Sequence, residues 1–370
     1  MLEILPLFCL SLFLAYCSQK NNFILKINEK VKIDLAFVFL VVALSVFAGL
    51  RTNYNDTWLY MKNFKNAVPL SEYLATEPGF FDNPFFYGFQ CFFRHNISNN
   101  FNLFCMLVSF FIIFSILRLI KKYSKNFILS ITIFFSLGLY YDILGAMKQM
   151  IAIAILTYAV DALIKKKTLL YFCIVLLATL FHSYAIFYLI LIIFINRPWS
   201  VTTYITVFAI AVLLLTFEST LDMIMSAAED AGKNLAEEEM KDNNGISPFR
   251  LMVFAIPPIL TLLFQNNLNP LYDRSKCILV NMSIISFLIM SLGIFTAANM
   301  FGRSAGYFLI SSIIILPWII EEIFDKESVK FASIIVGLCY VGFFYMESQG
   351  FDAEYSAMGL GEFFLSLSGR

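Results

Sequence analysis

The stretch FNLFCMLVSFFIIFSIL, residues 101–117, contains no charged side chain and decides the fold class. At about 1.5 Å per residue, a helix of this length approaches the roughly 30 Å hydrocarbon core of a bilayer. Similar runs occupy residues 201–217 and 277–295. These runs are apolar on every side instead of alternating, so they predict membrane-spanning helices and argue against β-barrel strands.

Composition extends this interpretation to the whole chain, because 60% of the 370 residues are hydrophobic and only 14% are charged. We expect an all-α polytopic membrane protein, a single integral membrane domain over residues 1–370. The formal net charge is zero, which gives no indication of a nucleic-acid partner. Hydropathy predicts about twelve spans, near residues 2–18, 33–50, 99–119, 127–142, 147–164, 168–182, 183–196, 201–217, 250–265, 277–297, 303–320 and 329–346.

Lysine and arginine predict the orientation of these spans. Short basic loops such as 20–32, 118–125 and 165–167 fall on one side, which the positive-inside rule assigns to the cytoplasm. The opposite side is acidic and carries two large loops. Residues 51–98 contain Trp58, Met61, Phe64 and Val68 at near-helical spacing, which predicts an interfacial helix. Residues 83–94 predict a second short helix, interfacial or re-entrant. The loop 218–249 contains AEEEMKDNN and is either a lid or a solvated acidic segment.

Scattered ionisable residues reach the predicted outer face from distant parts of the sequence. Lys148, Arg250 and Arg303 each open an inward-running span, where the helix dipole and free N–H groups favour an anion. Tyr307 follows Arg303 by one turn on the same predicted face. This pattern predicts a binding site for an anionic group such as a diphosphate, which arginine can bind in a bidentate manner. The predicted binding residues are Arg51, Tyr60, Lys148, Gln149, Arg250, Arg303 and Tyr307.

His182 and Asp56 are the two candidate general bases, and Asp142 is a weaker one. An outer arginine such as Arg51 can also be a snorkelling anchor, and a lone histidine is often structural, as we expect for His95. The chain has only two histidines, and its seven cysteines form no CxxC pair, so we expect no metal site. We see no motif for any other cofactor.

Four segments resemble the EpsG family of membrane proteins. GLRTNYNDTWLY (49–60) resembles its segment of arginine, then G/N-x-D, then tyrosine, and KQMIAIAI (148–155) resembles its R/K-Q-x-x-A helix start. LLATLFHSYAIFYLI (176–190) resembles its F-H-x-S/T-A segment, and RSAGYF (303–308) its late R-x-x-x-Y-F. The resemblance carries over to Arg51, Asp56, Lys148, Gln149, His182, Arg303 and Tyr307. Lys148 stands where many relatives have arginine. Lysine keeps the positive charge but cannot bind an anion through two parallel hydrogen bonds as arginine does.

The EpsG family is similar to Wzy-type polysaccharide polymerases. The resemblance implies a glycosyltransferase C-like fold, no metal, and polymerisation of undecaprenyl-diphosphate-linked oligosaccharides at the outer face of the bacterial inner membrane. The bilayer and these lipid-linked sugars would be its partners, and a chain-length regulator is a further candidate. The residues leave three alternatives open: a flippase or transporter, a non-catalytic subunit of an export assembly, and an acyltransferase acting on sugars.

Overall fold

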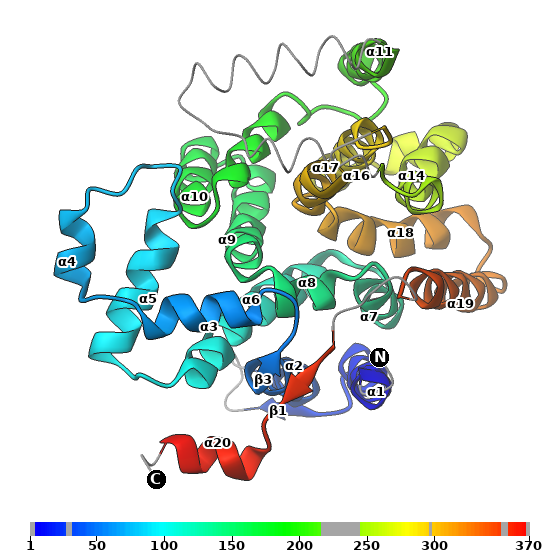
Figure 1. Cartoon of the computed structure of the whole chain (residues 1–370). Coiled ribbons are helices and arrows are strands. Elements are labelled where there is room, and N and C mark those ends of the chain that lie inside the picture. Colours follow the sequence, from blue (N-terminus) through cyan, green and yellow to red (C-terminus); the bar gives the residue numbers. More distant parts are fainter. Residues whose placement is uncertain (1–3, 27–31, 216–244, 296–297, 349–353, 368–370) are drawn as a thin grey trace. The chain divides into compact units, whose positions relative to one another are not determined.

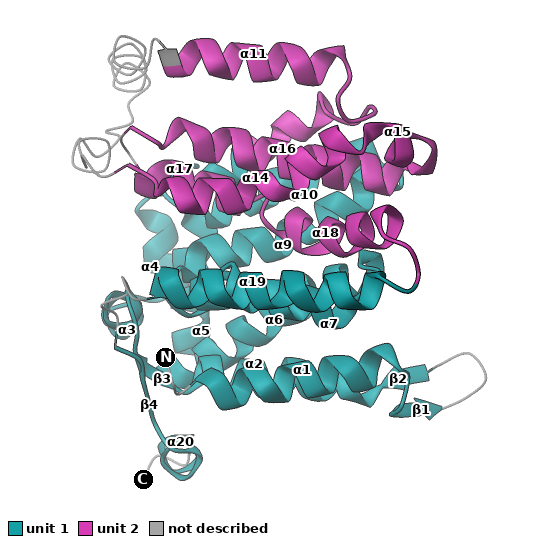
Figure 2. Cartoon of the chain, turned by 90° about the vertical axis from the view of Figure 1, so that its right-hand side faces the viewer, with its two compact units in different colours: residues 1–186, 327–370 teal, residues 187–326 magenta. Residues whose placement is uncertain are grey.

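The computed structural model describes residues 4–26, 32–215, 245–295, 298–348 and 354–367. Within them the chain is mostly helical and divides into two compact units, Met1–Ile186 with Glu327–Arg370, and Phe187–Lys326 (Figure 2). The predicted acidic lid at 218–249 falls almost entirely outside the described residues.

The first unit contains a row of packed helices. In order of packing the row runs α10, α9, α6, α2, α1, α7 and α19 (Figure 1). Their bounds are α1 Leu5–Gln19, α2 Leu35–Gly49, α6 Phe101–Tyr123, α7 Phe127–Ser136, α9 Met147–Ile164, α10 Thr168–Phe181 and α19 Val329–Ser348. The shorter helices are α3 Thr57–Lys65, α4 Leu70–Ala75, α5 Pro84–Asn96, α8 Leu139–Gly145 and α20 Leu360–Leu367.

Helix starts in this unit follow from polar residues placed before apolar runs. The Asn100 side chain accepts a hydrogen bond of 2.9 Å from Leu103 N, and the Asn126 side chain accepts one of 3.1 Å from Leu129 N. Asp34 accepts the Phe37 N–H in the same way at the start of α2. These bonds satisfy N–H groups that a helix leaves unpaired in its first turn.

Two small antiparallel sheets accompany the helices, and the sequence predicted neither. β1 (Ile24–Lys26) pairs with β2 (Lys32–Asp34). β3 (Arg51–Asn53) pairs with β4 (Ser356–Ala357), which joins the end of α2 to the C-terminal segment. Met358 N also donates to the Leu50 carbonyl at 3.0 Å.

The second unit is built around α16 (Arg274–Leu292), which packs on α14 (Pro248–Leu263), α17 (Ala298–Gly306), α18 (Ile310–Ile323) and α11 (Val201–Leu215). Short helices α15 (Gln265–Leu268) and η3 (Asn269–Leu271) follow α14. η2 (Ser183–Ile192) is a 3₁₀ helix that contains the boundary between the units. The segment predicted as a span at residues 183–196 therefore begins with a ten-residue 3₁₀ helix and not with an α-helix.

The predicted span positions coincide with helices, but the count of twelve is not confirmed. In the described residues, α6, α9, α16 and α19 are long and apolar enough to cross a membrane. Counting each of three bent pairs, α7 with α8, α14 with α15 and η3, and α17 with α18, as one span raises the number to seven. The remaining predicted spans correspond to the shorter helices α1, α2, α10, η2 and α11. The fold is thus that of a helical membrane protein.

A helix lies within the segment where the interfacial helix is predicted: α3 covers Trp58, Met61 and Phe64 but ends at Lys65, before Val68. Trp58 is 60% exposed, whereas Phe64 is fully buried. The buried face consists of Thr57, Tyr60 and Phe64, because Phe64 packs against rings from α5 and α6. The second predicted short helix, at residues 83–94, is confirmed as α5.

Candidate functional site

Arg51 lies directly after α2 and its side chain is fully buried. Nη1 donates to the carbonyl of Ala48, while Nε and Nη2 have no hydrogen-bond partner in the described part of the chain. Buried guanidinium donors are expensive to leave unpaired. Arg51 is therefore not a snorkelling anchor, and it retains unused capacity to bind an acceptor.

Neighbouring groups hold the backbone around Arg51. From α6, Asn102 Nδ2 donates to the carbonyls of Gly49 at 3.0 Å and Arg51 at 2.9 Å. In the C-terminal segment, the Tyr355 ring stacks on Phe47 with centroids 4.7 Å apart, and its hydroxyl donates to the Phe47 carbonyl at 2.9 Å. The end of α2 is fixed from two sides.

Asp56 and Tyr60 lie on the helix that follows. Asp56 occupies the N-cap position of α3 without a side-chain capping bond and is half-buried. Tyr60 is buried, and its ring packs edge-on against Phe86 of α5 at 5.8 Å. The Asp56 carboxylate therefore makes no capping hydrogen bond to α3. A carboxylate that serves as a general base needs an oxygen that can accept the substrate proton.

The loop between β3 and α3 also packs against the corner between α8 and α9. A Cβ added to Gly145 would lie 2.9 Å from Asn55 Nδ2 and 3.4 Å from Asn55 Cβ, so the Asn55 side chain lies directly against this corner. Burial, and to a lesser extent the nearby Asp142 carboxylate, raise the pKa of Tyr54 to about 12. Tyr54 therefore stays a neutral hydroxyl beside Asp142 at physiological pH.

Lys148 and Gln149 lie in the first turn of α9, as the sequence predicted. Lys148 Nζ donates to the hydroxyl of Tyr87 on α5 at 3.2 Å and lies 5.3 Å from the centre of its ring. Gln149 is buried. The ammonium group is thus held at the start of a helix, where the dipole also favours an anion.

His182 caps the C-terminus of α10 in an extended conformation, and its N–H donates to the Ala178 carbonyl at 3.0 Å. The imidazole is half-buried and meets Tyr184 edge-on at 5.4 Å. The next amide, Ser183 N, donates to Asn83 Oδ1 at 3.0 Å. Asn83 precedes α5, so the same helix contacts both the His182 and the Lys148 segments.

The structure thus connects the predicted residues of the first unit through direct contacts. The loop holding Arg51 and Asp56 contacts the α8–α9 corner, and α5 joins Tyr60, Lys148 and the His182 segment. Sequence reasoning missed Asn83 and Tyr87. The Asn-Pro pair at 83–84 was a usable signal, since it is typical of a helix start before an aromatic run.

Arg250, Arg303 and Tyr307 belong to the second unit. Arg250 is half-buried in the first turn of α14, as predicted. Arg303 is exposed in the last turn of α17, so its predicted place at a helix N-terminus is wrong. α17 ends at Gly306 and the chain bends by 61° into α18, which leaves the buried Tyr307 outside the turn assigned to it.

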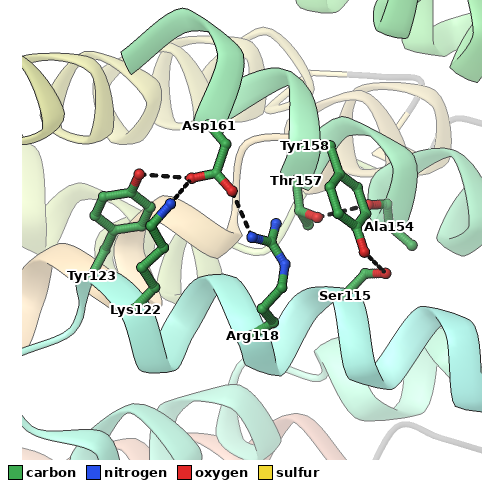
Figure 3. A network of polar contacts seen from close by, with 8 residues as sticks. All are labelled: Ser115, Arg118, Lys122, Tyr123, Ala154, Thr157, Tyr158 and Asp161. Carbon is green, nitrogen blue, oxygen red and sulfur yellow. Dashed lines mark hydrogen bonds and ion pairs between the residues drawn. The ribbon is translucent and has the colours of Figure 1, made fainter. Parts of the chain in front are cut away.

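Near the other end of α9 lies a different polar cluster. Asp161 accepts hydrogen bonds from Arg118 at 2.6 Å and Tyr123 at 2.7 Å and forms an ion pair with Lys122 (Figure 3). About thirteen residues separate it from Lys148, or roughly 20 Å along the helix. This cluster joins α6 to α9. Among the described residues, no group of three His, Cys, Asp or Glu side chains could hold a metal ion.

Comparison with known families now adds to this geometry. A sequence model described as the EpsG family matches residues 34–357. The chain belongs to the EpsG family. The match begins at the residue that caps α2 and ends in β4, so every predicted site residue of this EpsG-family chain falls within it. Neither a curated protein nor a solved structure matches the chain.

Proposed function

We propose that this EpsG-family protein is a polysaccharide polymerase with a glycosyltransferase C-like fold. It would join undecaprenyl-diphosphate-linked oligosaccharides at the outer face of the bacterial cytoplasmic membrane. Family membership supports a role in polysaccharide synthesis. The observation that carries the proposal is the contact of one helix, α5, with both a cation and the segment of a candidate base, Lys148 and His182.

The reaction is a displacement at the anomeric carbon of the growing chain. A hydroxyl of the incoming unit attacks that carbon from the face opposite the lipid diphosphate, and the new glycosidic C–O bond forms. The bond from carbon to diphosphate oxygen breaks, and its electron pair leaves with the diphosphate. The hydroxyl proton passes to His182 or, as the alternative base, to Asp56. The outcome is inversion at the anomeric centre.

Positive charge near the leaving group would lower the barrier. Lys148 would neutralise the departing diphosphate together with the start of α9. The unpaired donors of Arg51 would bind a second diphosphate oxygen once the site opens around it. Gln149 and Tyr60 would orient sugar hydroxyls, and Arg250, Arg303 and Tyr307 are proposed to bind the second substrate. No metal or organic cofactor takes part in this scheme.

The placement of charges favours transfer over transport. Arg51 follows the last residues of α2, Lys148 is the second residue of α9, and His182 directly follows α10. A transporter would instead carry ionisable groups in the middle of its spans, along the path of the substrate. A scaffold subunit would need no titratable group at this position.

The proposal is tested with purified protein, a synthetic undecaprenyl-diphosphate oligosaccharide and a chelator. We expect a ladder of longer lipid-linked products that His182→Ala abolishes. His95→Ala is the matched control, because this other histidine is bonded to the Ala67 carbonyl at 2.9 Å on the opposite end of α5. Loss of the ladder in both variants, or in neither, would contradict the role of His182. A ladder lost in Asp56→Ala alone would transfer the base role to Asp56.

A further inference from the structure

The start of α5 contacts two site segments, through its N-cap residue Asn83 and through Tyr87 in its first turn. Asn83 Oδ1 accepts the Ser183 N–H at 3.0 Å, next to His182. Four residues later, the Tyr87 hydroxyl accepts a hydrogen bond from Lys148 Nζ at 3.2 Å. The Asn83 carbonyl accepts the Tyr87 N–H at 3.4 Å, which places the two residues one turn apart at the start of the helix. A single helical turn therefore links His182 to Lys148.

Contacts elsewhere along α5 fix this helix independently of the site. At its C-terminal end, Arg94 Nη1 donates to the carbonyls of Phe64 and Ala67, both at 3.1 Å. In its first turn, Phe85 meets Phe181 edge-on at 5.9 Å and Phe86 is fully buried. Because α5 is anchored to α3 and to α10, its first turn is a rigid support for the groups it touches.

The Asn83 side chain makes no hydrogen bond to its own helix. It occupies the N-cap position, where an asparagine side chain normally accepts an N–H of its own helix, yet it makes no such bond. Its backbone has φ of 55° in the left-handed region, which asparagine tolerates better than most residues. The side chain instead accepts the amide that follows His182.

We propose that Asn83 and Tyr87 are positioning residues that set the orientation of His182 and the placement of the Lys148 ammonium group. This inference rests on the proposed function and deepens it. Tyr87 holds the cation at the start of α9, where the diphosphate leaves. Asn83 holds the chain directly after His182, which would keep the imidazole aimed at the acceptor hydroxyl.

Tyr87→Phe tests the first half and keeps the aromatic ring. We expect kcat for polymerisation to fall about tenfold with KM within about twofold, because a correctly placed charge acts mainly in the transition state. The matched control is Tyr73→Phe, whose hydroxyl donates to Pro84 of the same helix at 3.3 Å but does not bond Lys148. In a Lys148→Met background, Tyr87→Phe should produce no further loss. Equal losses of kcat in the two tyrosine variants would overturn the inference.

Asn83→Gly and Asn83→Asp test the second half. Glycine keeps the left-handed backbone but removes the acceptor, whereas aspartate keeps an acceptor oxygen. We expect kcat to fall about tenfold in Asn83→Gly and to be largely retained in Asn83→Asp. Equal activity of Asn83→Gly and the wild type would overturn the role of Asn83.

A binding measurement separates this inference from the proposed function. Free undecaprenyl diphosphate in detergent is the probe, because it carries the charge that develops on the leaving group and that the glycosyl-linked substrate lacks. Tyr87→Phe should weaken its binding several-fold, with the KM for substrate unchanged within about twofold, while Tyr73→Phe leaves the binding unchanged. If the wild type binds the probe without making polymer, the polymerase proposal fails. The positioning of Lys148 then stands on the difference between the two variants. Identical binding by both variants and the wild type would overturn it.

Discussion

Arg51→Met separates a binding role for this buried arginine from a structural one. The side chain is fully buried and makes one bond, from Nη1 to the Ala48 carbonyl, while Nε and Nη2 lack partners. Losing one charged hydrogen bond costs about 1.5–3 kcal/mol, and relieving each unsatisfied buried donor recovers about 1–3 kcal/mol. Methionine has a similar reach and carries no donor. We therefore expect the free energy of unfolding to rise by about 1 kcal/mol.

The assay combines unfolding in detergent, followed by circular dichroism, with polymer synthesis per folded molecule. Polymer synthesis should fall about 100-fold, the usual effect of removing one group that stabilises transition-state charge. Asn102→Ala is the control from the same corner, because it removes the bonds to the Gly49 and Arg51 carbonyls. It should lower the free energy of unfolding by about 1–3 kcal/mol. If Arg51→Met destabilises the protein as much as Asn102→Ala, Arg51 is structural and the reasoning is refuted.

Three further predictions concern the structural framework. Asp161→Ala should lower the free energy of unfolding by about 2 kcal/mol without changing polymer synthesis per folded molecule. Breaking a fully buried ion pair costs about 3–5 kcal/mol, and the expected loss is smaller here because the side chains of Arg118 and Lys122 are 24% and 38% exposed. Burial alone would raise the pKa of Asp273, but hydrogen bonds from Ser275 and the Lys276 N–H lower it, so this cap stabilises α16 above pH 3.8 and loses that effect as pH falls further. Unfolding midpoints of the wild type and Asp273→Ala should thus converge as the pH falls below 3.8. Thr52→Cys with Ser356→Cys should form a disulfide, since the two hydroxyl oxygens lie 2.9 Å apart. The wild type carries exposed free cysteines, so the measurement is the difference: more maleimide bound before reduction by the double variant than by the wild type would contradict the β3–β4 pairing.

Hydropathy alone located the helical segments, because each apolar run needs only its own sequence to form a helix in a membrane. The starts of α9 and α14 were equally local, and Lys148 and Arg250 lie in their first turns as predicted. The number of crossings was not predictable in this way. Several helices, such as Leu5–Gln19, are shorter than a straight span requires, and length alone does not decide their depth.

Long-range contacts account for what the sequence did not predict. The pairing of β3 with β4 joins residues about 300 positions apart and leaves no local pattern. The packing of Phe64 against rings of α5 and α6 was not predictable either, because it joins three helices that are separate in the sequence. Arg303 was placed at a helix start because the bend between α17 and α18 falls within an apolar run. Tyr87 was missed because its partner, Lys148, lies on another helix.

The central claim is that the protein forms glycosidic bonds by displacing the lipid diphosphate from the anomeric carbon. The most direct measurement counts the undecaprenyl diphosphate released and the new glycosidic linkages formed by the purified protein from one lipid-linked oligosaccharide. We expect one diphosphate released per linkage, with inversion at the new anomeric centre, and little release by Lys148→Met. Intact lipid-linked substrate after incubation, bound but not consumed, would contradict the account and favour transport or scaffolding.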